Sequence, residues 1–422
     1  VHRLPCFLWT VPLTNICKCC WGRAEESNRR TPSRMKEDSR HLAVFVYGLS
    51  GSGSGRRTLT LAHAFASRGH KVDLVVACSQ GPLYQELSPL VRLVAFDHRW
   101  RCLPWAVMNK SRWALASVAA LASYLRHEQP DVVLSAANHV NDAALWARYL
   151  ARSRTRLVVR VSNQLSPSAV YTRGANKLFR LQLAGRFYAW ADAIIAVSNG
   201  VADDVARVTS LPRESITTIY NPVVTPELQE KLRAPLDHPW FAPDNPPVVL
   251  AVGRLVAQKD FPTLLKAFAR VRAVRKARLI ILGEGKERPG LEALARKLGV
   301  ASDVALPGFM PNPFPYMMRA SVFVLSSAWE GLPGVLIEAM ACGCPVVSTD
   351  CPSGPAEILG GGAYGPLVPV ADDAALAKAI LLVLETPPDP ERLRAQAALF
   401  SVDRATDQYL QVLLGLSGLP KH

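Results

Sequence analysis

The residues best placed to do chemistry are two carboxylates, Glu330 and Glu338, which stand eight residues apart on either side of a Gly-Pro turn in WEGLPGVLIEAMACGCPVV. The preceding run SVFVLSS (321–327) is apolar and typical of a strand, GLPG is a turn sequence, and VLIEAMA contains good helix formers. The pattern predicts a strand, a turn and a helix, with one carboxylate before the helix and the other inside it.

The turn between the two carboxylates is the expected site for an anion. The free N–H groups and the positive dipole end at a helix start favour a diphosphate, and Gly334 has no side chain to keep it away. The turn consists of Gly331, Leu332, Pro333 (which offers only its carbonyl) and Gly334. Glu338 follows one turn later on the same helix face, where it could accept hydrogen bonds from ribose hydroxyls. Glu330 would face the group that the phosphate carries.

Each carboxylate also has a purely structural interpretation, as a favourable charge at a helix start or as a solvated position. The apolar residues on both sides of Glu338 instead favour a buried setting in which the carboxylate needs a partner.

Complementary charge lies upstream in VVLAVGRLVAQKDF. Gly253 and Arg254 follow an apolar strand (248–252), and Lys259 precedes an amphipathic helix. An arginine fork and a lysine point charge could together neutralise a diphosphate leaving group. Such a pair is also common on solvated surfaces, and its place in a second strand, loop and helix unit favours the anion site.

A family resemblance rests on these segments and their neighbours. The segments, in order, are GRLVAQKDFPTLLKAF, ARLIILGEG, VALPGF, WEGLPGVLIEAMACGCPVVSTDCPSGPAEIL and YGPLVPV. In this order the chain resembles the retaining glycosyltransferases of family 4, from about residue 42 to about residue 415. It is particularly similar to bacterial members that build lipopolysaccharide cores and other surface polysaccharides. The resemblance implies an α/β chain with the GT-B fold, in which two Rossmann-like domains face a central cleft that holds the active site.

The resemblance also implies roles for individual residues. Glu330 would contact the donor sugar, Glu338 would hold the nucleotide ribose, and Arg254 and Lys259 would bind the diphosphate. The catalytic candidates are therefore Glu330, Arg254 and Lys259. The donor-binding candidates are Gly53, Gly253, Gly331, Leu332, Pro333, Gly334 and Glu338.

The amino-terminal half reads as strand, loop, helix and strand. HLAVFVYGLS is an apolar strand, GSGSG (51–55) is expected to be a flexible loop, and LTLAHAFASRGH is a helix that ends at Gly69 before the strand VDLVVA. The glycines fit neither a dinucleotide fingerprint nor a P-loop, because the third spacing and the lysine are absent. Gly53 is the expected donor contact in this loop. Many family members carry an acidic residue where this chain has Gly55, so a role that needs that carboxylate does not transfer.

Two further strand ends supply candidate residues of lower rank. PDVVLSAANHV places Asn138 and His139 at the carboxyl end of a strand, where open α/β sheets bind ligands. Both are candidate substrate contacts, although a single histidine at a helix start is commonly a cap or a surface residue. In AIIAVSNGVADDVARV, Ser198 or Asn199 is the expected helix cap.

The chain is expected to contain two domains. Residues 35–225 would form an N-terminal acceptor domain and residues 226–390 a C-terminal donor domain, joined near the proline-rich stretch 221–247. Residues 391–422 would form helices that cross back toward the first domain. Residues 1–34, which lack an initial Met and show no periodicity, are expected to be a disordered or artefactual extension.

Composition agrees with a large enzyme. The 422 residues are 49% apolar, enough for two cores. The longest apolar stretch, 113–125, is shorter than the roughly 18 residues that cross a bilayer, so no membrane span is expected. The cysteines at 6, 17, 19 and 20 match no zinc pattern, and the other five are scattered, which favours reduced thiols in a cytoplasm.

The net charge of +15 is uneven, because residues 35–225 sum to +11 and residues 226–422 sum to zero. Trp100, Trp105 and Trp113 stand among basic residues at 99, 101, 110 and 112. This pattern suggests attraction to an anionic membrane or glycan, with a solvated basic face as the alternative. The expected location is cytoplasmic, peripheral on the inner face of the membrane, and no motif indicates a nucleic-acid partner.

The predicted function is transfer of a hexose-type sugar, with retention, from a nucleoside diphosphate sugar to a lipopolysaccharide, exopolysaccharide or lipid-linked glycan. UDP is the expected nucleotide. The nucleotide sugar is a co-substrate and no other cofactor is expected; without a D-x-D motif, no metal is expected either. One alternative is an epimerase or phosphorylase on the same fold, distinguished by whether donor consumption needs an acceptor. The other is a non-catalytic glycan-binding scaffold.

Overall fold

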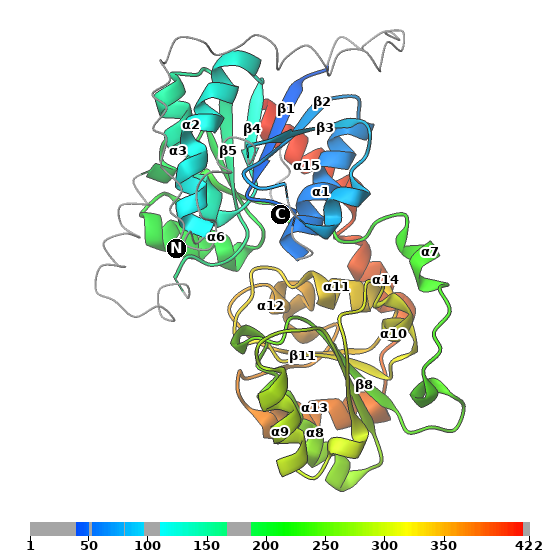
Figure 1. Ribbon diagram of the computed structural model, residues 1–422. Helices are drawn as coiled ribbons and strands as arrows, with labels where there is room; N and C mark the ends of the chain where they lie inside the picture. The colour runs from blue at the N-terminus through cyan, green and yellow to red at the C-terminus, as the bar shows by residue number, and fades with distance from the viewer. Residues whose placement is uncertain (1–38, 50–52, 80, 97–109, 167–186, 417–422) are drawn as a thin grey trace, which may run out of the picture. The chain divides into compact units, whose positions relative to one another are not determined.

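Two parallel β-sheets, each covered by helices on both faces, organise the chain (Figure 1). The structure is a computed structural model that describes residues 39–49, 53–79, 81–96, 110–166 and 187–416. Both sheets belong to one compact unit, Arg40–His422. The expected extension 1–34 lies outside the described residues.

The first sheet has the strand order β3-β2-β1-β4-β5-β6-β7, and every neighbouring pair is parallel. Its strands are β1 (His41–Val46), β2 (Lys71–Val76), β3 (Val91–Ala95), β4 (Val132–Ser135), β5 (Arg156–Val161), β6 (Ala193–Ala196) and β7 (Ile216–Thr218). The strands β1, β4 and β6 are nearly continuous apolar runs, as expected where helices bury both faces of a sheet. The order reverses between β1 and β4, as in a Rossmann fold.

The second sheet has the order β10-β9-β8-β11-β12-β13 and is also parallel throughout. Its strands are β8 (Val248–Val252), β9 (Arg278–Leu282), β10 (Val304–Gly308), β11 (Val322–Leu325), β12 (Val346–Thr349) and β13 (Leu367–Val368). Here the order reverses between β8 and β11, the two strands that the sequence places before the cationic loop and before Glu330. In open α/β sheets ligands bind beyond the carboxyl ends of the strands at such a point.

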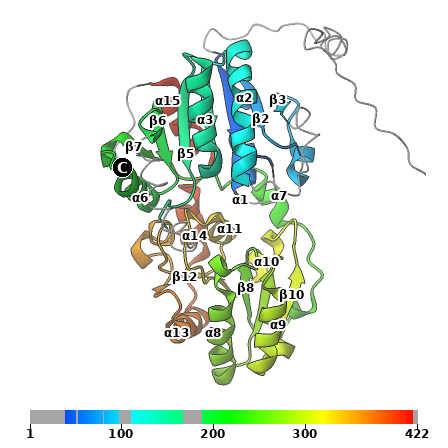
Figure 2. The same ribbon diagram turned by 60° about the vertical axis from the view of Figure 1, so that its left-hand side comes forward.

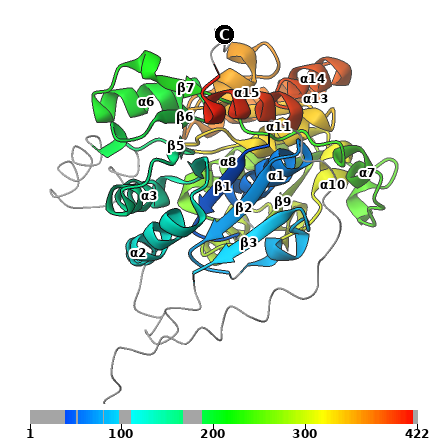
Figure 3. The same cartoon turned by 90° about the horizontal axis from the view of Figure 1, so that it is seen from above.

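The helices of the first sheet lie on opposite faces of it (Figures 2 and 3). They are α1 (Gly53–Ser67), α2 (Lys110–Glu128), α3 (Asn138–Ala151) and α6 (Asn199–Thr209). Alternate residues of β1 pack on each side: Leu42 and Val44 with α1, and Phe45 with α2 and α3. This alternation fixes the register of β1 in the sheet.

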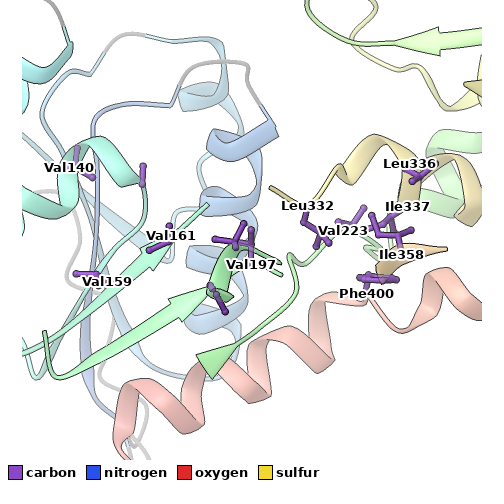
Figure 4. Packing of buried hydrophobic residues seen from close by; sticks show 14 of the residues in the cluster. Val140, Val159, Val161, Val197, Val223, Leu332, Leu336, Ile337, Ile358 and Phe400 are labelled. Atoms are coloured by element: carbon purple, nitrogen blue, oxygen red, sulfur yellow. The ribbon is translucent and has the colours of Figure 1, made fainter. Parts of the chain in front are cut away.

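The helices of the second sheet follow the same arrangement. They are α8 (Phe261–Val274), α9 (Arg288–Lys297), α10 (Phe314–Arg319), α11 (Gly334–Ala341), α12 (Pro355–Ile358) and α13 (Asp373–Glu385), with α7 (Leu228–Leu232) in the preceding linker. Val249 packs with α8 and α13, whereas Leu250 packs in the core that contains α11. Leu336 and Ile337 of α11 lie close to Val223 and Phe400 in that core (Figure 4).

The last described residues form two helices, α14 (Pro390–Ala398) and α15 (Val402–Leu414), as the sequence predicts after residue 385. Helix α14 packs on α11, while α15 packs on α1 of the first sheet, where Tyr409 meets Phe65 edge to face. Between these helices, the N–H groups of Val223 and Val224 donate to the carbonyl of Phe400 at 2.9 and 3.1 Å. The linker and the last helices are therefore held together by backbone hydrogen bonds.

A buried carboxylate, Asp73 of β2, forms hydrogen bonds with side chains from several elements around the first sheet. It accepts hydrogen bonds from Nε2 of His41 (2.8 Å), Nε of Arg92 (2.8 Å) and the hydroxyl of Tyr124 (2.6 Å). Burial raises the pKa of Asp73, but the hydrogen bonds from His41, Arg92 and Tyr124 outweigh it and hold the pKa well below its usual range. Ionised Asp73 therefore contributes to the stability of the fold.

Replacing Asp73 by asparagine is expected to destabilise the protein by about 2 kcal/mol at pH 7, because the buried carboxylate that accepts from Arg92 and Tyr124 is lost, although Arg92 is half-exposed and keeps its ion pair with Glu128. The depressed pKa gives stability that is present above about pH 4 and lost as the pH falls further, so the difference between wild type and D73N should shrink below pH 4. Urea unfolding at pH 7 and at pH 3.5 measures both effects, with the exposed Asp237→Asn as control. A constant difference across this range would contradict the assignment.

Candidate functional site

The loops that carry the predicted residues lie at the reversal point of the second sheet. Gly253 and Arg254 directly follow β8, and Lys259 ends a short 3-10 turn just before α8. Glu330 lies between β11 and α11, and β11 pairs directly with β8. The sheet thus places Lys259 beside Glu330, although 71 residues separate them in the sequence.

Lys259 Nζ and Glu330 Oε1 form an ion pair at 2.6 Å. The side chains are only 14% and 9% exposed, so the pair is shielded from water. Ser327 Oγ donates to the same carboxylate oxygen at 2.7 Å, and Gln258 Nε2 lies 3.5 Å from the other oxygen. An ammonium has three N–H donors, so the pairing with Glu330 leaves donors for a phosphate oxygen.

Gly253 and Arg254 occupy the same loop in different ways. A Cβ at Gly253 would lie 3.1 Å from Cε of Lys259, so the glycine makes room for the lysine stem. Arg254 is exposed, and its guanidinium is available to an incoming anion. The structure therefore brings Lys259 and Glu330 together and leaves Arg254 at the surface of the loop.

The turn 331–334 leads into α11 as predicted, and Glu338 lies within that helix. Gly331 is closely approached by the loop after β5: a Cβ there would stand 2.1 Å from the carbonyl oxygen of Ser162. Ser198 also reaches the turn, because its hydroxyl donates to the carbonyl of Gly331 at 2.8 Å. Leu332 and Pro333 are buried. Loops of the first sheet thus cover the expected phosphate turn.

Ser198 is the predicted cap of α6, and the structure confirms it: the Ser198 side chain accepts a hydrogen bond from the N–H of Val201 at 3.2 Å. The following N–H groups, of Asn199 and Gly200, donate to the carboxylate of Glu357 at 2.8 and 3.0 Å. Glu357 belongs to α12 of the second sheet. A carboxylate at a helix N-terminus is stabilised by the helix dipole. Because α6 packs on the first sheet and α12 on the second, this contact joins the two.

Arg57 is a site residue that sequence reasoning missed. It lies in α1 and is buried, and it forms an ion pair with Glu338. Its spacing could have indicated that it is buried, because Arg57, Leu61 and Phe65 follow one another every four residues and all are buried. An arginine within an apolar helical stripe needs an anionic partner, and the sequence did not identify that partner.

The expectation of a flexible loop over 51–55 is wrong in part, because α1 already begins at Gly53. Burial of Gly55, Arg57 and Thr58 on the inner face of the helix outweighs the low helix propensity of glycine. Gly53 itself is exposed, and a Cβ there would meet nothing within 4 Å. Its contact with a donor stays a prediction.

Asn138 opens α3 and joins two strand ends. Its Oδ1 accepts from the N–H of Ser162 and its Nδ2 donates to the carbonyl of Asn163, both at 2.8 Å. Asn138 thus holds the loop that touches Gly331.

For His139, the next residue of α3, the structure describes only the backbone. Trp100 and Trp105 lie outside the described residues, as does the side chain of Trp113.

Comparison with family models identifies both halves of the chain. Residues 51–226 match the model described as Glycosyltransferase Family 4, and residues 235–400 match the model described as Glycosyl transferases group 1. Among the described helices, none combines the length and apolar content needed to cross a bilayer.

Two relatives share about a third of their aligned residues with the chain. The lipopolysaccharide core biosynthesis glycosyltransferase LpsE of Rhizobium meliloti is 35% identical over 57% of this chain and 70% of its own length. A Campylobacter jejuni enzyme, N-acetylgalactosamine-N,N'-diacetylbacillosaminyl-diphospho-undecaprenol 4-alpha-N-acetylgalactosaminyltransferase, is 33% identical over 59% of this chain. That match spans 65% of the Campylobacter enzyme.

Solved structures show the same fold at lower identity. HepE of Anabaena, solved in complex with UDP and glucose, superposes with a TM-score of 0.71 at 20% identity, covering 89% of this chain and 100% of HepE. The lipopolysaccharide outer core galactosyltransferase WaaB, in its apo form, gives a TM-score of 0.65 at 19% identity, covering 89% and 99%. With two Rossmann-like sheets, matches to both family models and the similarity to LpsE, the chain belongs to glycosyltransferase family 4 and has the GT-B fold.

Proposed function

We propose that the protein transfers a hexose-type sugar from a nucleoside diphosphate sugar, with UDP as the nucleotide, to a growing lipopolysaccharide, exopolysaccharide or lipid-linked glycan, with retention of anomeric configuration. The observation that carries the proposal is the shielded Lys259–Glu330 pair beside the turn that opens α11. The names of the relatives support the acceptor class, since LpsE acts in lipopolysaccharide core biosynthesis and the Campylobacter enzyme is named for a diphospho-undecaprenol acceptor.

In this proposal the positively charged groups of the site surround the position from which the diphosphate leaves. Lys259 and Arg254 contact its oxygens, and the N–H groups at the start of α11 face it with the positive end of the helix dipole. These groups neutralise the leaving group without a metal ion. Glu330 faces the donor sugar, and Glu338 accepts hydrogen bonds from the ribose. We assign no general base.

The acceptor side of the proposal rests on charge. Residues 35–225, which include the first sheet, carry a net charge of +11, whereas residues 226–422 are neutral. An anionic glycan or an anionic membrane surface would be attracted to the basic half. Peripheral contact with the membrane would bring a lipid-linked acceptor to the cleft.

A panel of UDP-, GDP- and ADP-sugars tests the donor site, with binding scored by thermal shift and slow hydrolysis by nucleotide release from the full chain. We expect stabilisation by a UDP-sugar that disappears in Glu338→Ala and Lys259→Ala. No stabilisation by any nucleotide or sugar nucleotide would overturn the proposal. Donor conversion that does not need a glycan acceptor, with an altered sugar as the product, would replace it by an epimerase.

The stereochemical part of the proposal has its own test. Once an acceptor is found, the one-bond carbon–hydrogen coupling at the new anomeric centre distinguishes an α- from a β-linkage. We expect the anomeric configuration of the donor to be kept. An inverted product would overturn the retaining assignment without affecting the donor site.

A further inference from the structure

The ion pair between Arg57 and Glu338 joins the two Rossmann-like domains. Arg57 comes from α1 of the first, Glu338 comes from α11 of the second, and 281 residues separate them. Their side chains are 7% and 15% exposed. The other terminal nitrogen of Arg57, Nη1, lies 3.3 Å from the carbonyl of Pro222 and 3.5 Å from that of Val223, in the linker. The guanidinium is therefore held in place by two other segments of the chain, α11 and the linker.

The same guanidinium covers the first turn of α11. A Cβ at Gly334 would lie 2.9 Å from Nη2, 3.4 Å from Nε and 3.6 Å from Cζ of Arg57. Three guanidinium atoms within 4 Å of one point mean that the group lies across Gly334. This is the residue at which the N-terminus of α11 would receive the diphosphate, and any larger side chain there would push Arg57 away.

The positive charge of Arg57 would affect how the donor diphosphate binds near Glu338. Glu338 lies four residues, about 6 Å along the helix axis, from Gly334, so its charge would repel a diphosphate bound at the turn. Arg57 lies between these two points and neutralises the carboxylate. A guanidinium has five N–H donors in a planar fork, so Arg57 can serve Glu338 and a phosphate oxygen at the same time.

We propose that Arg57 is a donor-binding residue that α1 contributes from the first Rossmann-like domain, and that its guanidinium bridges Glu338 and the diphosphate of the donor. The inference rests on the proposed nucleotide-sugar site and adds a contact from the opposite domain. Because the linker carbonyls of Pro222 and Val223 also hold the guanidinium, binding of the diphosphate is coupled to the arrangement of the two domains.

The test is calorimetric titration of the full chain with UDP, UMP and uridine. In Arg57→Gln we expect UDP to bind about 50-fold more weakly and uridine less than about threefold more weakly, because a charge-assisted contact to phosphate is lost. Arg57→Lys should keep UDP affinity within about tenfold of wild type, since it retains the charge but not the fork. The matched control is Arg68→Gln, which removes a surface arginine paired with Asp403 and Asp407 just after the same helix.

Glu338→Gln provides the second comparison. It should weaken all three ligands by a similar factor, because the ribose is common to them, whereas Arg57→Gln should act on the phosphates alone. Tighter UDP binding by Arg57→Gln would show that Arg57 competes with the donor, and unchanged binding would show a purely structural role; either result overturns the inference while the donor site stands. If wild type binds no nucleoside diphosphate, the proposed function and the inference both fail. Thermal unfolding of each variant verifies that it is folded. If Arg57→Gln does not fold, Arg57→Lys still tests the inference.

Discussion

Replacing Lys259 by alanine is expected to lower turnover about a thousandfold, because a preorganised cation at a developing negative charge contributes roughly 10²–10³ in rate. The Lys259 ammonium is already fixed 2.6 Å from Glu330 and largely shielded from water, so in the proposed reaction it would need little reorganisation as the diphosphate leaves. The measurement is kcat by nucleotide release at saturating donor and acceptor.

The protein should stay folded after this change. Glu330 keeps the hydrogen bond from Ser327 and the nearby amide of Gln258, so its carboxylate is not left without partners. The control is Lys266→Ala, which removes an exposed lysine on the adjacent helix α8 and should leave kcat unchanged. Near-normal turnover by Lys259→Ala would exclude the proposed cationic stabilisation of the leaving group.

Changing Glu330 to glutamine is expected to lower kcat about a hundredfold and to leave the affinity for UDP within about threefold. The amide keeps the size of the side chain but removes the charge that holds Lys259 and that, in the proposed function, faces the donor sugar. UDP lacks the sugar, so its binding reports on the nucleotide part of the site alone. Steady-state kinetics together with UDP titration separate the two effects.

Glu385→Gln is the matched control, because Glu385 is an exposed carboxylate at the end of α13. It should change neither kcat nor UDP affinity. If Glu330→Gln weakened UDP as much as it lowered turnover, Glu330 would act on the nucleotide and its assignment to the sugar would be wrong.

Much of the site could be predicted because its parts are local. Strand 321–327, the GLPG turn and the following helix are encoded in consecutive residues, and the structure has β11, the turn and α11 there. The same holds for β8 and the loop that carries Gly253, Arg254 and Lys259. Hydrophobic periodicity and turn chemistry act over a few residues, so the sequence displays them directly.

The glycine-rich segment shows where local rules fail. Glycines at 51, 53 and 55 favour a loop, yet α1 begins at Gly53 because the residues that follow are buried against the first sheet. Packing of an inner face contributes more than propensity at one or two positions. The start of this helix was therefore decided by tertiary contacts.

By itself, the sequence determined the α/β class, the strand, turn and helix units, and the identity of Glu330, Glu338, Arg254 and Lys259 as candidate residues. The tertiary structure alone decided their partners: strand order brings β8 beside β11 and so Lys259 to Glu330, and the two domains bring Arg57 to Glu338 and Glu357 to the start of α6. Periodicity records which face of an element is buried, but it holds no information about which distant element covers that face.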